Sequence, residues 1–216
     1  MELALYAPGL GYYSAGAAKL GASGDFITAP EISALFGRCL ARQCYDILGA
    51  MGSGDILELG AGSGRLAVDL LEELERLDLL PGRYLILELS ADLRARQQQL
   101  INDRISHLCD RVEWLDRLPE QPVHGIVIAN EVLDALPVHC IQLDENGMHE
   151  MVVAGEGDGF TWQQRPLNDR LEQAFRVMLA ELPGPLPAGY RTEINTGLHD
   201  WFAAIAVYLQ PASCCS

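Results

Sequence analysis

The sequence has few basic residues and no long apolar run, and each absence excludes a class of function. Lys and Arg together number 15 against 30 Asp and Glu, a formal net charge of −15 over 216 residues. Nucleic-acid binding needs clustered cations that neutralise phosphates, so we expect no nucleic-acid partner and some attraction for a basic protein. No apolar segment approaches the roughly 20 residues that span a bilayer, so we expect no membrane insertion.

Cysteine and histidine are also scarce, and neither is spaced as metal ligands are. The six cysteines include no Cys-x-x-Cys pair, and the five histidines show no ligand spacing. A disulfide framework and a zinc site are therefore disfavoured, and we expect no metal. Reduced thiols fit a cytosol-like compartment, and the N-terminal letters M-E-L-A-L-Y lack the basic start of a secretory signal.

Changes in composition and hydrophobic pattern divide the chain into four segments. We expect a glycine-rich cap segment and a helix (Ile32 to Met51) in residues 1–54, and alternating strands and helices in residues 55–137. Residues 138–166 predict a β-hairpin insertion, with an Asn-Gly turn at 146–147, and residues 167–216 a helical segment. The short apolar runs D-I-L-E-L-G, Y-L-I-L-E-L-S, V-E-W-L and G-I-V-I-A-N are the expected strands of the core. Their alternation with helices is typical of a Rossmann-like, doubly wound, mostly parallel α/β sheet.

The first strand runs into a glycine-rich phrase, E-L-G-A-G-S-G-R, in which a strand meets a helix. Without Cβ atoms the backbone can turn sharply and approach a ligand, while the N–H groups of the helix face it. A dinucleotide fingerprint would place a glycine or alanine where Arg65 stands, so a pyrophosphate ligand is disfavoured. Glu58, directly before the loop, favours a cationic or neutral ligand. The candidate ligand-binding residues here are Glu58, Gly60, Gly62 and Gly64.

Two further strand ends carry acidic or amide side chains. Glu88 ends the second expected strand, 24 residues after Gly64, where a carboxylate can accept both hydroxyls of a ribose. Taken alone, an acidic strand end is more often a solvated terminus. The fourth expected strand, Gly125–Ala129, runs straight into Asn130 and Glu131, with Asp134 three residues further on.

Several long motifs together resemble the MidA-like family of class I S-adenosylmethionine-dependent methyltransferases. These motifs are L-Y-A-P-G-L-G-Y-Y-S, G-D-F-I-T-A-P-E-I-S-A-L-F-G, N-E-V-L-D-A-L-P-V and E-I-N, and the likeness runs from about Met1 to Leu209. The family includes the mitochondrial arginine methyltransferase needed for respiratory complex I assembly. The resemblance implies a class I methyltransferase sheet, S-adenosyl-L-methionine as cofactor and a protein substrate, such as a subunit of a complex I-type enzyme. It also implies the bacterial cytoplasm or, in a eukaryote, the mitochondrial matrix.

The resemblance also implies roles for individual residues. Glu58, the three glycines, Glu88 and Asn130 would form the cofactor site, with Thr28 and Pro30 of the cap segment beside it. Asp25, Glu31 and Tyr13 would contact the substrate, although ordered loop packing explains Tyr13 equally well. Glu131 and Asp134 are the candidate catalytic residues, because carboxylates can grip a guanidinium bidentately. For Asp134 the alternative is simple stabilisation of a helix N-terminus.

The chain departs from the family after Tyr208-Leu209-Gln210, where P-A-S-C-C-S follows in place of a glycine and a fifth strand. We interpret this as a truncated or frame-shifted product, the alternative being a deliberately shortened chain with tag remnants. We then expect an unpaired edge on strand four, self-association through it, reduced stability and little methyl transfer. Two other functions stay open: a non-catalytic S-adenosylmethionine-binding assembly factor, and a nucleotide-dependent oxidoreductase on the same sheet.

Overall fold

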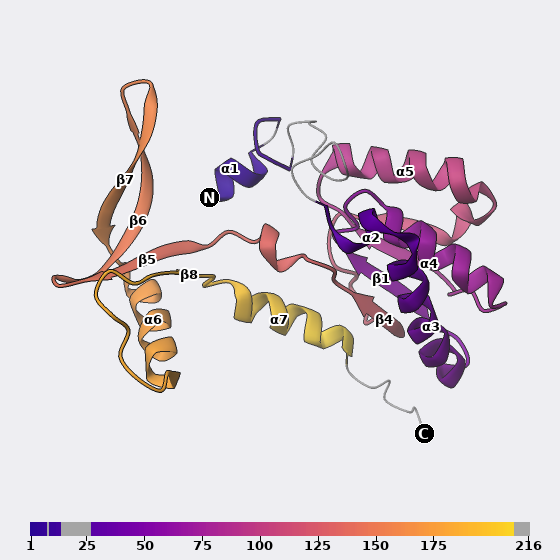
Figure 1. Cartoon of the computed structure of the whole chain (residues 1–216). Coiled ribbons are helices and arrows are strands. Elements are labelled where there is room, and N and C mark those ends of the chain that lie inside the picture. Colours follow the sequence, from indigo (N-terminus) through magenta and orange to yellow (C-terminus); the bar gives the residue numbers. More distant parts are fainter. Residues whose placement is uncertain (8, 14–26, 210–216) are drawn as a thin grey trace. The chain divides into compact units, whose positions relative to one another are not determined.

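Residues 1–7, 9–13 and 27–209 are described by a computed structural model, in which two sheets organise two separate units (Figure 1). One unit comprises Leu3–Ala135 and the residues from Ala204 onward, and we call it the parallel-sheet unit. The other comprises Met1–Glu2 and Leu136–Ala203, and we call it the antiparallel-sheet unit. Among the predicted site residues, Asp25 lies outside the described residues.

The parallel-sheet unit contains four short strands in the order β3-β2-β1-β4, and every neighbouring pair is parallel. The strands are β1 (Asp55–Leu59), β2 (Tyr84–Leu87), β3 (Val112–Leu115) and β4 (Gly125–Ile128). These are the four strands that the apolar runs predict, and the mixed α/β fold with a parallel sheet is confirmed. The register pairs Leu59 with Leu87 and Leu87 with Leu115, so the strands end together at one edge. In α/β sheets that edge is where ligands bind.

Three helices cover one face of this sheet and form its main core. They are α3 (Ala34–Met51), α4 (Arg65–Arg76) and α5 (Ala91–Ile105), with the 3₁₀ helix η1 (Ser106–Arg111) after them. Their apolar residues pack against Ile56, Tyr84 and Ile86 of β1 and β2. α3 and α4 lie side by side (Figure 1), because Gly37 leaves room for the backbone of α4. A Cβ on Gly37 would come within 2.7 Å of the Asp69 Cβ.

The single helix predicted from Ile32 to Met51 is wrong at its start. The short helix α2 (Ala29–Ile32) ends before Ser33, whose backbone is extended at φ −161°. The Ser33 Oγ accepts a hydrogen bond from the Leu35 N–H and begins α3 as its N-cap. A serine that caps a helix thus separates two helices whose apolar pattern is continuous in the sequence.

The antiparallel-sheet unit has strand order β7-β6-β5-β8. The strands are β5 (His139–Asp144), β6 (Gly147–Glu156), β7 (Gly159–Pro166) and β8 (Arg191–Ile194), and α6 (Asp169–Glu181) packs Leu171 and Phe175 against Ile141. The predicted hairpin is confirmed, with the turn one residue earlier, and β7 extends it as a third strand. Gly147 pairs with Asp144 as the first residue of β6, so the two turn residues are 145 and 146.

The remaining elements are α1 (Glu2–Tyr6), the 3₁₀ helices η2 (Leu133–Ala135) and η3 (Val207–Leu209), and α7 (Leu198–Ala206). Across the part of the chain that the structure describes, none of the helices has the length and apolarity needed to cross a membrane. Four described cysteines, at 39, 44, 109 and 140, are free thiols.

Candidate functional site

The glycine loop lies between the end of β1 and the start of α4. Gly60, Gly62 and Gly64 have φ values of 65°, 56° and 86°, in the left-handed region that favours glycine. The Gly60 N–H donates to the Leu87 carbonyl at 3.0 Å, which ties the loop to the end of β2. Gly64 is the N-cap of α4 and has no side chain to cap it, and the Ser63 Oγ accepts the Arg65 N–H at 3.3 Å, which leaves further N–H groups of that end without a side-chain cap. The loop therefore presents backbone donors at the carboxyl edge of the sheet.

Glu58 is buried directly before this loop, with 2% of its surface exposed. Its Oε2 accepts a hydrogen bond from the Tyr84 hydroxyl at 2.8 Å. Burial raises the pKa of the Glu58 carboxyl to about 7, the Tyr84 hydrogen bond opposes this rise, and the nearby charge of Glu88 adds to it. The protein thus holds a carboxyl group that titrates near neutral pH beside the candidate ligand loop.

Glu88 follows β2 and is 7% exposed. Its Oε1 accepts the Ser90 N–H at 2.8 Å, and its Oε2 accepts from the Gln97 Nε2 at 3.0 Å. Burial raises the pKa of Glu88, while the hydrogen bonds from Ser90 and Gln97 lower it. Two buried carboxylates therefore stand at the ends of adjacent strands.

Two tyrosines of the N-terminal segment contact the residues that follow β2 and β4. The Tyr6 hydroxyl donates to the Ala135 carbonyl, and the rings of Tyr6 and Tyr13 stack with centroids 5.6 Å apart. The Ser90 hydroxyl donates to the Tyr13 carbonyl at 2.8 Å. Burial, and after it the charge of Asp134, raise the pKa of Tyr13. The structure thus brings Tyr13 between the end of β2 and the segment that follows β4.

That following segment carries the predicted catalytic residues. Asn130 is half-buried, whereas Glu131 and Asp134 are exposed, and Asp134 lies in η2. Glu131 has φ +53°, which is uncommon for a residue with a side chain and often marks a functional position. The segment adjoins the glycine loop, because a Cβ on Gly60 would lie 3.6 Å from the Val132 Cγ2.

The cap residues that the structure describes meet the glycine loop. The Ser63 hydroxyl donates to the Glu31 Oε1, and the Arg65 Nη1 lies 3.9 Å from the Glu31 Oε2. Pro30 is buried in α2, and Thr28 is the N-cap position of that helix without a side-chain capping bond. Glu31, predicted from the resemblance to contact substrate, is here engaged with the loop itself.

Gln97 is a residue of this site that the sequence did not indicate. It lies in α5 with 0% exposure, and its Nε2 donates to the Gly62 carbonyl at 2.9 Å as well as to Glu88. The Trp114 Nε1 donates to the Gln97 Oε1 at 3.0 Å. Its only local signal is its place in a run of three glutamines, 97 to 99, which does not distinguish it from its neighbours.

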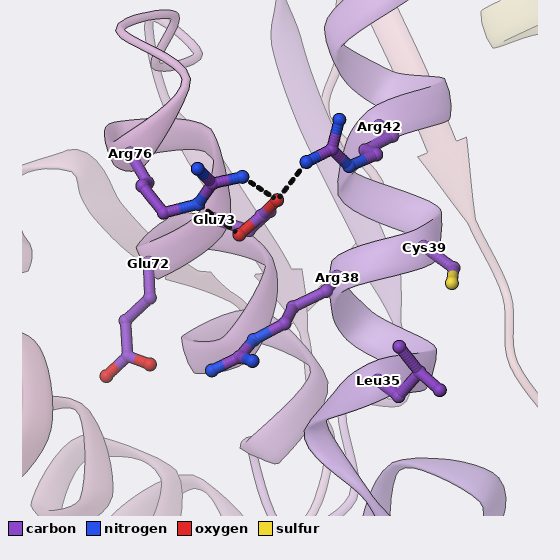
Figure 2. Close-up of a pocket in the computed structure, with 7 residues that line it drawn as sticks. All are labelled: Leu35, Arg38, Cys39, Arg42, Glu72, Glu73 and Arg76. Carbon is purple, nitrogen blue, oxygen red and sulfur yellow. Dashed lines mark hydrogen bonds and ion pairs between the residues drawn. The ribbon is translucent and has the colours of Figure 1, made fainter.

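A groove of about 560 Å³ elsewhere in the same unit has a different character (Figure 2). It is lined by side chains of α3 and of the later turns of α4, whereas the glycine loop precedes the first turn of α4. At its centre the Glu73 carboxylate is held by Arg76 at 2.7 Å and by Arg42 at 3.2 Å. The hydrogen bond from Arg76 and the charges of the arginines lower the pKa of Glu73 to about 2. This cluster joins two helices and contributes nothing to the carboxyl edge of the sheet.

Comparisons with known proteins identify the family. The family model described as "Putative S-adenosyl-L-methionine-dependent methyltransferase" matches residues 39–214, which is most of the chain. The chain belongs to this MidA-like methyltransferase family. The resemblance found in the sequence motifs is thereby confirmed.

Relatives of known name and structure agree with this family. The crystal structure of a "likely methyl transferase" from Burkholderia thailandensis, bound to S-adenosyl-homocysteine, is 41% identical with a TM-score of 0.83, over 94% of this chain and 52% of that one. The mitochondrial protein arginine methyltransferase NDUFAF7 of Danio rerio is 34% identical, over 71% of this chain and 42% of the relative. Its Drosophila melanogaster homolog is 29% identical, over 88% of this chain and 46% of the relative. The chain thus spans about half the length of the relatives it matches.

Proposed function

We propose that the carboxyl edge of the parallel sheet binds S-adenosyl-L-methionine, and that the protein methylates arginine side chains of a protein substrate. The observation that carries the proposal is the pair of buried carboxylates, Glu58 and Glu88, on either side of a loop with three left-handed glycines. The relatives named above support the arginine substrate, and a subunit of a complex I-type enzyme is the acceptor we favour.

The chemistry of the site fits a cationic nucleoside better than a phosphate. Both buried acids would repel a pyrophosphate, and the arginines next to the loop and near Glu88 already have partners. Arg65 lies 3.9 Å from Glu31, and Arg94 is 2.6 Å from Asp116. The Glu88 carboxylate would accept the ribose hydroxyls, and the backbone of the glycine loop would approach the rest of the cofactor. These contacts disfavour the nucleotide-dependent oxidoreductase.

When bound, the cofactor supplies an electrophilic methyl group on a sulfonium that is also the leaving group. The protein must then hold a guanidinium whose pKa of roughly 12.5–13.8 keeps it protonated at neutral pH. Glu131 and Asp134 would grip that guanidinium bidentately and localise its charge away from the attacking nitrogen. The exposed Glu131 carboxylate makes no ion pair with the residues that the structure describes, so it is open to an incoming cation. Asn130, at the end of β4, would orient cofactor or substrate through its amide.

Calorimetric titration tests the cofactor assignment. We expect saturable binding of S-adenosylmethionine by the unsubstituted chain, and loss of most of that affinity in Glu88→Ala. The matched control is Glu120→Ala, since the Glu120 side chain is 82% exposed and should leave the affinity unchanged. Saturable binding of NADH without any binding of S-adenosylmethionine would overturn the proposal in favour of the oxidoreductase.

Transfer is tested separately, by mass spectrometry of basic peptides after incubation with protein and S-adenosylmethionine. We expect slow methylation of arginine peptides, in keeping with the little transfer expected of this chain, and none of matched lysine peptides. In a full-length relative carrying the substitution that corresponds to Glu131→Gln, transfer should be lost with cofactor affinity retained. Unchanged turnover in that variant would exclude the role proposed for this carboxylate. Cofactor binding without transfer to any basic protein would instead support the assembly-factor alternative.

Location and assembly follow from the same proposal. The relatives' names place them in mitochondria, so we propose the mitochondrial matrix for a eukaryotic source and the cytoplasm for a bacterial one. Within the described residues β4 pairs with β1 alone and forms an edge of the sheet. Self-association through this edge is the accompanying proposal. Sedimentation of a Val127→Lys variant tests it, because a charge on β4 should shift an associated chain toward monomer.

A further inference from the structure

We propose that Gln97 is a positioning residue that fixes the Glu88 carboxylate in the orientation needed to accept the ribose hydroxyls. This inference rests on the proposed cofactor site. Gln97 is fully buried in α5, and its Nε2 reaches two parts of that site at once. It donates to the Glu88 Oε2 at 3.0 Å and to the Gly62 carbonyl at 2.9 Å.

The Gln97 amide can satisfy its partners in one orientation only. The indole N–H of Trp114 is a donor with no acceptor capacity, and it reaches the Gln97 Oε1 at 3.0 Å. The Gly62 carbonyl is an acceptor only, as is an ionised Glu88 carboxylate. If the amide were turned over, its NH₂ would face the indole donor and its oxygen would face two acceptors. Trp114 therefore directs the two amide hydrogens of Gln97 toward the candidate cofactor site.

This arrangement leaves Glu88 with free acceptor capacity. An ionised carboxylate has about four lone-pair sites. The Ser90 N–H occupies one at Oε1 and Gln97 occupies one at Oε2. The Leu89 backbone N–H also hydrogen-bonds the Glu88 carboxylate, so at least one lone-pair site remains for a ribose hydroxyl. A side chain held by a bond to each oxygen has also lost the rotational freedom that ligand binding would otherwise have to restrict.

Gln97 also sets the distance between α5 and the glycine loop. A Cβ on Gly64 would lie 3.2 Å from the Gln97 Cγ and 3.3 Å from its Cα and Cβ. The close approach lets one amide bridge the loop and the strand end, and it needs glycine at position 64 in addition to the left-handed φ. The two halves of the cofactor site, the loop after β1 and the carboxylate after β2, are thus joined through Gln97.

A buried glutamine that merely fills the core would show different pH behaviour. The Gln97 N–H stabilises the ionised form of Glu88, so removing it should raise the pKa of this carboxyl. The other charged or titratable groups that face Glu88 are Glu58 of β1, Tyr6 of α1 and Arg94 of α5, and none of these changes in a Gln97 variant. The acid limb of the ligand-binding profile should therefore move to higher pH when Gln97 loses its donor.

The test is calorimetric titration of S-adenosyl-homocysteine at several pH values into the unsubstituted chain, Gln97→Met and Gln98→Met. Methionine keeps the length of the side chain without its hydrogen-bonding groups, and Gln98 is an exposed neighbour on the same helix. We expect Kd to rise about tenfold in Gln97→Met at pH 7, the effect of one charge-assisted hydrogen bond. The acid limb of the binding profile of Gln97→Met should shift to higher pH. Gln98→Met should have the same Kd and the same pH profile as the unsubstituted chain.

A second variant keeps the proposal testable if Gln97→Met does not fold. Gln97→Glu has the same shape but carries no proton to donate when ionised, so its binding should be poor at pH 8 and recover in part near pH 5.5. Equal affinity and an equal pH profile in the unsubstituted chain and the Gln97 variants would overturn the role of Gln97 alone. Absence of binding in the unsubstituted chain would instead remove the proposed cofactor site, and the positioning role with it.

Discussion

Replacing Glu58 by glutamine should remove a large part of the pH dependence of folding in the parallel-sheet unit. The substitution keeps the shape of the side chain and an oxygen that can accept the Tyr84 hydroxyl, which lies 2.8 Å from Oε2. It removes the titration of a carboxyl whose pKa burial raises from 4.5 to about 7. The change therefore isolates the ionisation of one buried group.

The sign and size follow from the two pKa values. Between pH 4.5 and about 7 the folded chain keeps a proton on Glu58 that the unfolded chain has released. This group therefore favours folding most below pH 4.5, and its contribution is lost as the pH rises through 7. The full effect corresponds to about 3 kcal/mol, of which about 2.5 kcal/mol lies between pH 5 and pH 8.

The assay is urea unfolding at pH 5 and pH 8, followed through the fluorescence of a single tryptophan. The chain has three tryptophans, and Trp114 lies in β3 whereas Trp162 and Trp201 lie in the antiparallel-sheet unit. A background with phenylalanine at these last two positions reports on the parallel-sheet unit alone. From pH 5 to pH 8, the free energy of unfolding of the unsubstituted chain should fall by about 2.5 kcal/mol more than that of Glu58→Gln.

Glu120→Gln serves as the control, because the exposed Glu120 side chain should leave the pH dependence unchanged. If Glu58→Gln and the unsubstituted chain lost equal stability between pH 5 and pH 8, Glu58 would be ionised throughout that range. The burial argument for this carboxyl would then be refuted.

Three further changes test other parts of the structure. Tyr84→Phe removes the donor to Glu58 and should raise the pKa of that carboxyl further, lowering stability at pH 8 by about 1–3 kcal/mol in the same unfolding assay. Gly64→Ala should lower the free energy of unfolding by at least about 1 kcal/mol and weaken cofactor binding in calorimetry, because the φ of Gly64 is +86° and a Cβ there would crowd α5. Gly157→Ala is the control: Gly157 has φ +59° and open space around it, so this change measures the cost of the backbone angle alone. Phe175→Ala should destabilise the antiparallel-sheet unit by about 3–5 kcal/mol, measured by urea unfolding through the fluorescence of Trp162 and Trp201. An equal loss of stability in the parallel-sheet unit would contradict the division into two units.

The elements that the sequence predicts well are those whose pattern is local. Each strand of the parallel sheet is a short apolar run, since burial removes the alternation of a half-exposed strand. The glycine loop is visible because left-handed backbone angles demand glycine within a few residues of one another. The pairing of β8 with β5 depends on residues about 50 positions earlier in the chain, which no local pattern reports.

The parts of the site that the sequence does not reveal depend on distant partners. In the sequence Glu31 is one acid within T-A-P-E-I-S, and its contact with Ser63 joins positions 32 residues apart. Gln97 has the same local surroundings as the exposed glutamine next to it, and only the packing of α5 against the sheet turns it inward. Helical periodicity alone gives α5 a weak apolar face, so the burial of a polar residue there is decided by tertiary structure.

The two buried carboxylates give one further test, which connects stability to ligand chemistry. A carboxyl with a pKa of about 7 is about half protonated at pH 7, and a nearby positive charge favours its ionised form. Binding of S-adenosylmethionine should therefore release up to about half a proton from Glu58, measured by calorimetry in buffers of different ionisation enthalpy. S-adenosyl-homocysteine lacks the sulfonium charge and is the matched ligand, so it should release fewer protons, and Glu58→Gln should abolish the difference. Equal proton release for both ligands would mean that Glu58 does not sense the sulfonium, and its burial would then need an explanation in the fold alone.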